Sequence, residues 1–379
     1  MLRAGRGGKG GMRGEDDGAG TVLLFTSNGV GMGHLTRAVA IARRLAPAFR
    51  PVIVTLSQAF AVCRTFGLHA EHLPYHRQLE TEPGPWNASL ARELGLMVDA
   101  HRARLLLFDG TVPYGGMLAA VRDRPDLPSV WCRIGMWRER PEAALLAREG
   151  EFALVVEPGE LAAAYDTGPS RRHRDRTVTV PPIRLLDDGE LLPRATARAE
   201  LGLDPDRPAV LVALGSGNNL ARGDLVRRVV DHLLARGDVG VAVAAWLMAD
   251  GEPELDPRAR RLDGFPHARW LNAFDAAVSA ASYGLYHELA AALVPTLFVP
   301  NEHPENDDQL ARARFARDRG FGACVRAGEA DEAALGAVLD DLLEPASLAA
   351  CRVVLDGLDR RNGASAAAAI VATLARGSA

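Results

Sequence analysis

His34 stands where a glycine-rich turn runs into a helix, and it is the side chain of this sequence best placed to move a proton. A neutral imidazole accepts the proton of a hydroxyl group when a carboxylate holds its second nitrogen. Asp109 ends a later strand at the same edge of the expected sheet, where it can hold that nitrogen. The two residues predict a general base with its orienting carboxylate. The alternative is that His34 only caps the helix and Asp109 only caps a turn.

The turn before His34 is rich in glycine, which lets a backbone bend tightly and approach a ligand closely. Its last three residues are Gly31, Met32 and Gly33. They lead into a helix start, whose free N–H groups favour an anion such as a diphosphate. The glycine spacing departs from the dinucleotide fingerprint, and no acidic residue follows the second strand to hold a ribose. NAD is therefore disfavoured as a cofactor.

Two strand ends in the second half of the sequence suit a phosphate. The strand at 209–214 runs into a turn whose amides and hydroxyl can hold one, made of Gly215, Ser216 and Gly217. The strand at 276–279 leads into a small polar turn and a helix start. The backbone of that helix start is a second candidate, formed by Tyr283, Gly284, Leu285 and Tyr286.

Three nearby side chains have the chemistry to bind sugar hydroxyls. Glu288, in the first helical turn, can accept hydrogen bonds from both hydroxyls of a ribose, and the alternative is an acid that only satisfies the helix dipole. Asp308 and Gln309 offer further acceptor and donor groups. His287 lacks the second histidine of a zinc motif, and the acidic loop at 302–308 is typical of a solvated loop. We therefore expect no metal.

The composition is that of a folded protein without a strong electrostatic field. The chain has 379 residues, of which 48% are hydrophobic and 24% charged, with 44 Lys and Arg against 48 Asp and Glu. The net charge of −4 disfavours nucleic acid as a partner. The 4 cysteines are scattered, and no apolar run reaches the roughly 18 residues of a membrane-spanning helix. These features exclude collagen, coiled coils, secreted disulfide scaffolds and integral membrane proteins, and they predict a cytoplasmic protein.

Short apolar strands alternate with helices along the chain, which predicts the α/β class with doubly wound parallel sheets. The expected strands are 21–26, 51–56, 104–108, 129–134, 152–157, 209–214, 239–246, 276–279 and 296–300, and the expected helices are 36–45, 58–66, 225–235, 285–292, 307–318 and 365–376. Prolines and acidic residues interrupt this rhythm between residues 181 and 193. The expected organisation is a flexible tail at 1–20, a Rossmann-like domain at 21–182, a linker at 183–195, a second Rossmann-like domain at 196–358 and a C-terminal helical segment at 359–379.

Taken together, four motifs resemble those of nucleotide-sugar glycosyltransferases with the GT-B fold. In chain order they are Gly31-Met32-Gly33-His34-Leu35-Thr36-Arg37, Tyr283-Gly284 to Glu288, Leu293-Val294-Pro295 to Pro300, and Asp308-Gln309-Leu310-Ala311-Arg312-Ala313. The resemblance covers about residues 21–375 and points to the branch that contains the peptidoglycan GlcNAc-transferase and many actinobacterial natural-product glycosyltransferases. It implies two Rossmann-like domains that face each other across a cleft.

The resemblance also implies roles for the candidate residues. In the second domain, which binds the donor, Glu288 holds the ribose, residues 308–309 hold the sugar, and the turns at 215–217 and 283–286 hold the diphosphate. In the first domain, which binds the acceptor, His34 deprotonates a hydroxyl and Asp109 orients its ring. The sugar of a UDP- or dTDP-sugar is then transferred with inversion and without a metal or other cofactor, because helix N–H groups stabilise the leaving diphosphate. The last helix crosses back onto the first domain.

Two departures from the family's pattern keep alternatives open. Ser282-Tyr283-Gly284 stands where relatives have two glycines, and Arg37 stands where many have proline. The arrangement G-x-G-H-x-x-R also resembles the UDP-sugar hydrolase of the pseudaminic acid pathway, in which water replaces the acceptor. A third interpretation is a nucleotide-sugar-binding protein without turnover.

The sequence encodes the acceptor only indirectly. The segments from Tyr75 to His101 and from Cys132 to Arg138 carry aromatic and basic residues that can line an acceptor pocket or belong to the core. Abundant Ala, Arg and Gly with scarce Lys are typical of high-GC actinobacteria, which favours a natural product or other small molecule over a lipid-linked acceptor. The basic stretch at 170–176 allows at most a peripheral contact with a membrane.

Overall fold

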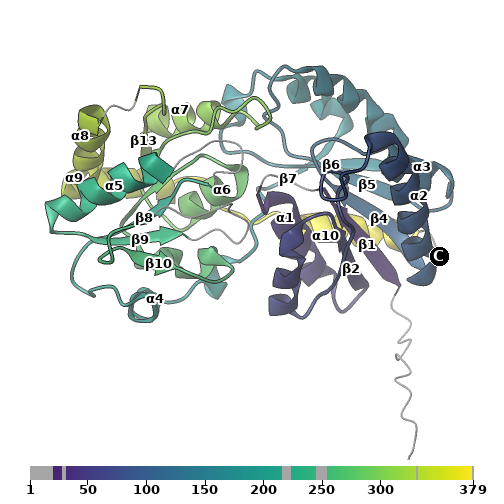
Figure 1. Ribbon diagram of the computed structural model, residues 1–379, viewed down its shortest axis with the longest axis horizontal. Helices are drawn as coiled ribbons and strands as arrows, with labels where there is room; N and C mark the ends of the chain where they lie inside the picture. Colours follow the sequence, from purple (N-terminus) through teal and green to yellow (C-terminus); the bar gives the residue numbers. More distant parts are fainter. Residues whose placement is uncertain (1–19, 28–30, 216–222, 245–253, 330–331, 378–379) are drawn as a thin grey trace, which may run out of the picture.

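The computed structural model describes residues 20–27, 31–215, 223–244, 254–329 and 332–377, and it shows two α/β halves side by side (Figure 1). Each half is built around one sheet in which every strand pairing is parallel. The doubly wound α/β class is therefore confirmed. The tail at 1–19 and the turn residues Ser216 and Gly217 lie outside the described part of the chain.

The first sheet has the strand order β3-β2-β1-β4-β5-β6-β7. Its strands are β1 (Thr21–Thr26), β2 (Arg50–Thr55), β3 (His69–His72), β4 (Ala103–Asp109), β5 (Ser129–Cys132), β6 (Leu154–Pro158) and β7 (Val178–Val180). The helices of this half are α1 (Gly33–Leu45), α2 (Pro83–Ala100) and α3 (Gly115–Arg122), with 3₁₀ segments η1 (Gln58–Phe66), η2 (Pro141–Glu151), η3 (Ala163–Tyr165) and η4 (Pro169–Arg176).

The second sheet has the strand order β10-β9-β8-β11-β12-β13. Its strands are β8 (Ala209–Ala213), β9 (Gly240–Ala244), β10 (Arg260–Leu262), β11 (Ala276–Ser279), β12 (Thr296–Phe298) and β13 (Gly322–Cys324). The helices around it are α4 (Arg194–Leu201), α5 (Gly223–Arg236), α6 (Tyr283–Ala291), α7 (Gln309–Arg319), α8 (Glu332–Leu343) and α9 (Pro345–Asp356), with 3₁₀ segments η5 (Asp188–Glu190) and η6 (His267–Ala273). The chain then continues into α10 (Ala364–Arg376), which lies against the first half.

The strand order reverses once in each sheet, and this switch point is where open α/β sheets bind ligands. In the first sheet the reversal lies between β1 and β4, whose last residues Thr26 and Asp109 are in register. In the second sheet it lies between β8 and β11. The chain after these four strands leads to His34, Thr111, Gly215 and Tyr283. The topology thus places the candidate motifs at the two carboxyl edges where binding is expected.

The strand cores are apolar because both faces of each sheet are covered. Leu23, Leu24 and Phe25 of β1 are fully buried, and α1 buries an apolar stripe against the same sheet. The alanine-rich α10 packs on α1 and β4, so the last helix of the chain lies against the first sheet (Figure 1). Its small side chains allow this close approach between helices.

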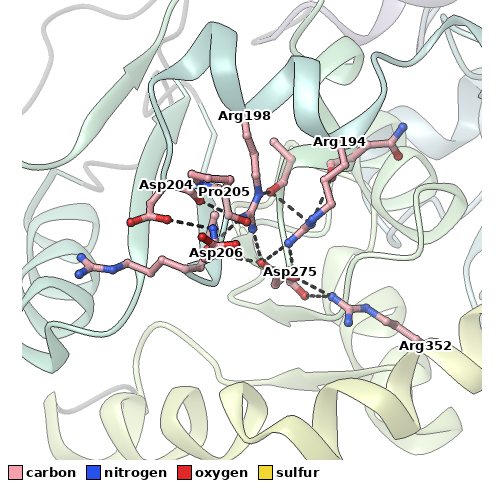
Figure 2. A network of polar contacts seen from close by, with 11 residues as sticks. Arg194, Arg198, Asp204, Pro205, Asp206, Asp275 and Arg352 are labelled. Carbon is pink, nitrogen blue, oxygen red and sulfur yellow. Dashed lines mark hydrogen bonds and ion pairs between the residues drawn. The ribbon is translucent and has the colours of Figure 1, made fainter.

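A cluster of charged side chains links α4 and α9 to the amino ends of the strands in the second sheet, at the edge opposite the switch point. Asp275, immediately before β11, pairs with Arg194 and Arg198 of α4 and with Arg352 of α9 (Figure 2). Arg198 also donates to the carbonyl oxygens of Asp204, Pro205 and Arg207. Because these contacts lie at the opposite end of the strands from the candidate motifs, we assign them to stability.

Candidate active site

A cavity of about 600 Å³ lies between the two halves, and both halves line it. Residues after β1 and β4 face it from the first sheet, and residues after β8 and β11 face it from the second. Ten of the residues predicted from the sequence line this cavity: Gly31, Met32, Gly33, His34, Gly215, Tyr283, Gly284, Leu285, Glu288 and Gln309. One space therefore joins the early and late motifs.

His34 and Asp109 meet directly at the switch point of the first sheet. The imidazole Nδ1 lies 2.8 Å from Asp109 Oδ1, and the Asp109 side chain is fully buried. The His34 side chain is 16% exposed and lines the cavity, with Nε2 lying 3.5 Å from Thr111 Oγ1. An Nδ1–H group that donates to the carboxylate leaves the Nε2 lone pair free to accept a proton.

Arg37 completes this arrangement, although sequence reasoning assigned it no contact with Asp109 and noted it as a departure from the family's pattern and as the last residue of the G-x-G-H-x-x-R arrangement. Its Nε and Nη2 donate to the two oxygens of Asp109 at 3.0 and 2.6 Å, which is a bidentate pair. The same Nη2 lies 2.9 Å from His34 Nδ1. Burial by itself raises the pKa of Asp109, but the charge of Arg37 and the hydrogen bond of His34 outweigh it and hold that pKa below its ordinary value. The carboxylate is therefore kept ionised.

The wall of the cavity that the second half contributes is built around the N-terminus of α6. The N–H groups of the first helical turn have no acceptor within the helix, so they offer partial positive charge to an anion. An added Cβ at Gly284 would meet nothing within 4 Å, which leaves a ligand room to approach the backbone there. Across the switch point, Gly215 has a φ of +94°, a conformation that only glycine adopts without strain.

Glu288 and Gln309 lie farther along this wall. Burial raises the pKa of Glu288 to about 7, against the opposing effects of the Arg184 charge and a backbone hydrogen bond at Leu185. Burial makes the ionised form of this carboxylate unfavourable when no ligand is bound. Hydroxyl groups that donate hydrogen bonds to the carboxylate would stabilise the ionised form, which fits a site that binds such groups. Gln309 Oε1 accepts a hydrogen bond from Asn301 N at 2.9 Å, so this side chain also fixes the neighbouring loop.

Two residues predicted to hold the donor do not reach the cavity wall. Tyr286 is fully buried among Phe298 and Phe321, and its N–H donates to Ser282 O inside the helix. Asp308 is the N-cap of α7, and its carboxylate accepts from Ala311 N at 3.0 Å. The prediction for Tyr286 was wrong because α6 already begins at Tyr283, so the Tyr286 amide is bonded within the helix and is not available to a ligand. The prediction for Asp308 was wrong because its carboxylate caps α7.

Tyr283 connects α6 to the first half of the molecule. Its hydroxyl donates to Gly159 O at 3.0 Å and accepts from Ile183 N at 3.1 Å. Its ring lies between two guanidinium groups, those of Arg37 and Arg312, each 5.5 Å from the ring centre. These contacts give the large aromatic side chain at this position a structural role, where the resemblance to the family implies glycine.

A buried ion pair lies next to this ring. Glu160, after β6, accepts from Arg312 Nε of α7 at 2.7 Å, and both side chains are almost completely buried. Its other oxygen lies 3.2 Å from His287 Nε2 of α6. Burial raises the pKa of Glu160, but the charges of Arg312 and His287 outweigh it and lower that pKa to about 2.

The wall of the cavity that the first half contributes is largely aromatic. Tyr75, Tyr114 and Trp137 line it, together with Val112 and Ile134. Within the first of the two candidate segments, Trp86 is buried in the core and packs edge-on against Tyr75 and Tyr114, and Met97 packs against the same core. From the second half, the segment from Phe265 to Ala268 also lines the cavity, and no pattern in the sequence marked it.

The acidic loop before α7 is occupied by protein contacts. Glu302 pairs with Arg326, and Asp307 pairs with Arg312. Two arginines of the first half, Arg138 and Arg140, donate to the carbonyl oxygens of Glu302 and Glu305. The loop therefore fastens the two halves together at one end of the cavity. Within the described ranges, no helix is long and apolar enough to cross a membrane.

Comparison with known proteins gives a consistent result. No family model matches the chain. A UDP-N-acetylglucosamine–N-acetylmuramyl-(pentapeptide) pyrophosphoryl-undecaprenol N-acetylglucosamine transferase of Clavibacter michiganensis is 32% identical over 186 residues, which are 47% of this chain and 48% of the relative. The chain thus spans about half the length of the curated relatives it matches.

Solved structures match over nearly the whole chain. The glycotransferase of kitacinnamycin has a TM-score of 0.64 at 17% identity, covering 94% of this chain and 99% of that one. The spinosyn rhamnosyltransferase SpnG complexed with thymidine diphosphate has a TM-score of 0.59 at 18% identity, covering 93% and 99%. The chain therefore has the GT-B fold, and it resembles the branch of that fold that contains the peptidoglycan GlcNAc-transferase and natural-product glycosyltransferases.

Proposed function

We propose that this chain is an inverting glycosyltransferase that moves a sugar from a UDP- or dTDP-sugar to the hydroxyl of a small molecule. The observation that carries the proposal is the geometry of His34, which lines the cavity while Asp109 engages its Nδ1 at 2.8 Å. The N-terminus of α6 lines the same cavity from the other half. A base and an anion-binding helix end on opposite walls are the two parts that sugar transfer requires.

In the proposed reaction, His34 Nε2 takes the proton of the acceptor hydroxyl. The acceptor oxygen forms a bond to the anomeric carbon while the bond from that carbon to the diphosphate oxygen breaks, which inverts the configuration. The electron pair leaves with the nucleoside diphosphate, and the N–H groups at the start of α6 stabilise its charge, so the reaction proceeds without a metal. Asp109 stays ionised and stabilises the imidazolium that forms.

The aromatic acceptor wall supports a small apolar acceptor. Tyr75, Tyr114 and Trp137 offer ring surfaces that suit a polyketide-like or aromatic ring system. Several structural neighbours act on natural products, as their names state, which agrees with this choice. The sequence relatives act on a lipid-linked acceptor by name, and a lipid-linked acceptor is therefore the competing choice.

One observation favours hydrolysis as a second candidate. Arg37 is the last residue of the G-x-G-H-x-x-R arrangement, and it donates two hydrogen bonds to Asp109, the carboxylate that engages His34. The arginine and the histidine of the hydrolase-like motif therefore share one carboxylate. In that reaction water takes the place of the acceptor hydroxyl, and His34 remains the base. A protein that binds nucleotide sugars without turnover is the third candidate.

Release of nucleoside diphosphate from a panel of UDP-, dTDP- and GDP-sugars separates these candidates. Thermal shifts recorded with the same panel report binding. A transferase binds one donor, releases little diphosphate in water, and releases it rapidly when a suitable acceptor is added. Fast release in water alone favours the hydrolase, and binding without release under any condition favours the binding protein. Absence of stabilisation by every nucleotide would contradict all three.

A further inference from the structure

Three side chains of the kinds that bind metals meet at the edge of the first sheet. His69 and Glu71 lie on β3, and His101 follows the last residue of α2. Their ligand atoms all lie within 4.8 Å of one another, and in the described part of the chain no other group of three His, Cys, Asp or Glu side chains does so. None of the three lines the cavity, so they are free of the proposed reaction.

The spacing of these atoms fits one tetrahedral ion. Glu71 Oε1 lies 3.0 Å from His69 Nε2 and 2.5 Å from His101 Nε2. Two imidazole nitrogens and a carboxylate oxygen bound to Zn²⁺ at about 2.0–2.2 Å would lie roughly 3.4 Å apart. Small rotations of the three side chains therefore bring them to the distances that a metal requires. The ion would replace the protons that the two imidazoles now share with the carboxylate.

We propose that His69, Glu71 and His101 bind one divalent transition-metal ion, of which Zn²⁺ suits two imidazoles and a carboxylate best. Three protein ligands leave one position for water. The site is half-exposed, since the side chains of His69, Glu71 and His101 are 60%, 29% and 18% exposed, so an ion can enter from solvent.

Arg50 of β2 is the charged group that opposes this site. Its Nη2 lies 3.4 Å from His101 Nδ1, and its guanidinium also donates to Thr21 Oγ1 at 3.2 and 3.3 Å. Once a metal occupies Nε2, His101 carries its proton on Nδ1 and can no longer accept from Arg50. Arg50 is exposed and keeps Thr21 as a partner, so it can turn away. Loss of its positive charge should therefore strengthen metal binding.

The position of the site gives the ion a structural role. It joins β3 to the end of α2, which are the two ends of the segment that carries Tyr75 into the cavity wall. Within this segment Trp86 Nε1 donates to Pro74 O at 3.0 Å, and the Trp86 ring packs edge-on against Tyr75 at 5.3 Å. A metal at the base of the segment would fasten it and thereby steady the aromatic acceptor wall.

The test uses the full chain without an affinity tag, dialysed against a chelator and titrated with Zn²⁺ by calorimetry. We expect one Zn²⁺ per chain and a higher melting temperature when it is bound. Co²⁺ in the same site should show the visible absorption of a four-coordinate ion. These readouts do not depend on any activity of the protein, so they stand apart from the test of the proposed reaction.

Substitutions then locate the ion. Glu71→Gln and His101→Gln should each weaken Zn²⁺ binding by about tenfold or more, which corresponds to about 1.4 kcal/mol. Arg50→Gln should strengthen it. His232→Gln is the matched control, because His232 forms the same kind of pair with Asp340 at 3.0 Å but belongs to no group of three.

His69→Asn alters the most exposed ligand and keeps the test valid if the other two variants fold poorly. Binding that is lost in His69→Asn and kept in His232→Gln supports the site. Failure of the wild-type chain to bind Zn²⁺, or equal binding by the wild type and His69→Asn, would overturn the proposal.

Discussion

The guanidinium of Arg37 in α1 lies 5.5 Å from the ring centre of Tyr283 in α6, and it also donates two hydrogen bonds to Asp109. One side chain thus connects the carboxylate that holds His34 to α6 of the other half. Arg312 lies over the same ring and pairs with Glu160 of the first half. The positions of His34 and of α6, the proposed base and the proposed donor-binding helix, therefore depend on one set of buried charges.

His34→Ala should lower turnover by about 10²–10⁴-fold, the usual contribution of a general base. Nucleotide binding should change little, because His34 contacts Asp109 and Thr111 on the acceptor side. Diphosphate release and a binding titration with the same nucleotide measure the two effects. His232→Ala, at a surface pair outside the cavity, serves as the control. Wild-type turnover in His34→Ala would remove the assignment of the base.

Arg37→Met should reduce kcat more than it changes KM for the donor, because Asp109 loses its bidentate partner and His34 its fixed orientation. The free energy of unfolding should fall by about 3–5 kcal/mol, since a buried carboxylate is left with less compensation. Arg37→Lys should recover only part of the activity, because an ammonium cannot form the planar fork.

The matched control for Arg37 is Arg44→Met on the same helix. Arg44 pairs with Asp187, whose side chain is 54% exposed, so this change should cost at most about 1 kcal/mol. Steady-state kinetics and urea unfolding of the three variants give the comparison. Equal losses of stability in Arg37→Met and Arg44→Met would show that the buried pair does not stabilise the fold.

Glu288→Gln should weaken nucleotide binding by about 10–100-fold, because hydrogen bonds to a charged acceptor are the stronger ones. It should also change how stability depends on pH. The folded pKa of Glu288, about 7, exceeds the ordinary value of 4.5, so the contribution of this group to stability is fully present below pH 4.5 and is lost as the pH rises through 7. The variant stays neutral and should gain stability over the wild type at pH 8.

Thermal melts at pH 5.5 and pH 8 and nucleotide titrations at pH 8 measure both consequences of Glu288→Gln. The control is Glu305→Gln, which changes an exposed acid at the rim of the same cavity. An unchanged dissociation constant in Glu288→Gln would remove the ribose role, whatever the melts show.

Glu160→Gln should destabilise the protein by about 3–5 kcal/mol at neutral pH, because the buried Arg312 then keeps only one carboxylate, that of Asp307, to balance its charge. The folded pKa of Glu160, about 2, lies below the ordinary value of 4.5. Its contribution is therefore fully present above pH 4.5 and is lost as the pH falls toward 2. The difference between variant and wild type should shrink over that range.

Urea unfolding of Glu160→Gln at pH 7 and pH 3.5 checks this expectation. Asp318→Asn is the control, since Asp318 forms an ion pair with Arg317 on the surface. A difference that stays constant between the two pH values would mean that ionisation of Glu160 does not stabilise the junction of the two halves.

The sequence was informative where the fold repeats a simple unit. The strands expected at 21–26 and 276–279 are confirmed to the residue, and the helix expected at 365–376 is α10 with one residue added. Continuous apolar runs mark strands that are buried on both faces, and such runs need no knowledge of their neighbours. The short strands β3, β7, β10 and β13 were missed, because three or four residues at or near a sheet edge carry no periodic signal.

The meeting of His34 and Asp109 could be predicted from the sequence because of a general rule. Both residues follow or end strands of a parallel sheet, and the carboxyl ends of such strands meet at one edge. The N-terminus of α6 could be placed in the same way. What the sequence by itself determined about this protein is therefore the pair of Rossmann-like units and the strand ends at which chemistry occurs.

Only the tertiary structure decided how the side chains of the two halves meet. In the sequence Arg37 differed from the family's pattern, and only the structure shows that it binds Asp109 and contacts Tyr283. Glu160 likewise binds Arg312, which lies 152 positions later in the sequence. The starting points of α6 and α7 likewise determine that Tyr286 is buried and that Asp308 caps a helix. The physical reason is that a buried charge must find its partner in three dimensions, and local sequence spacing does not specify contacts between separate sheets.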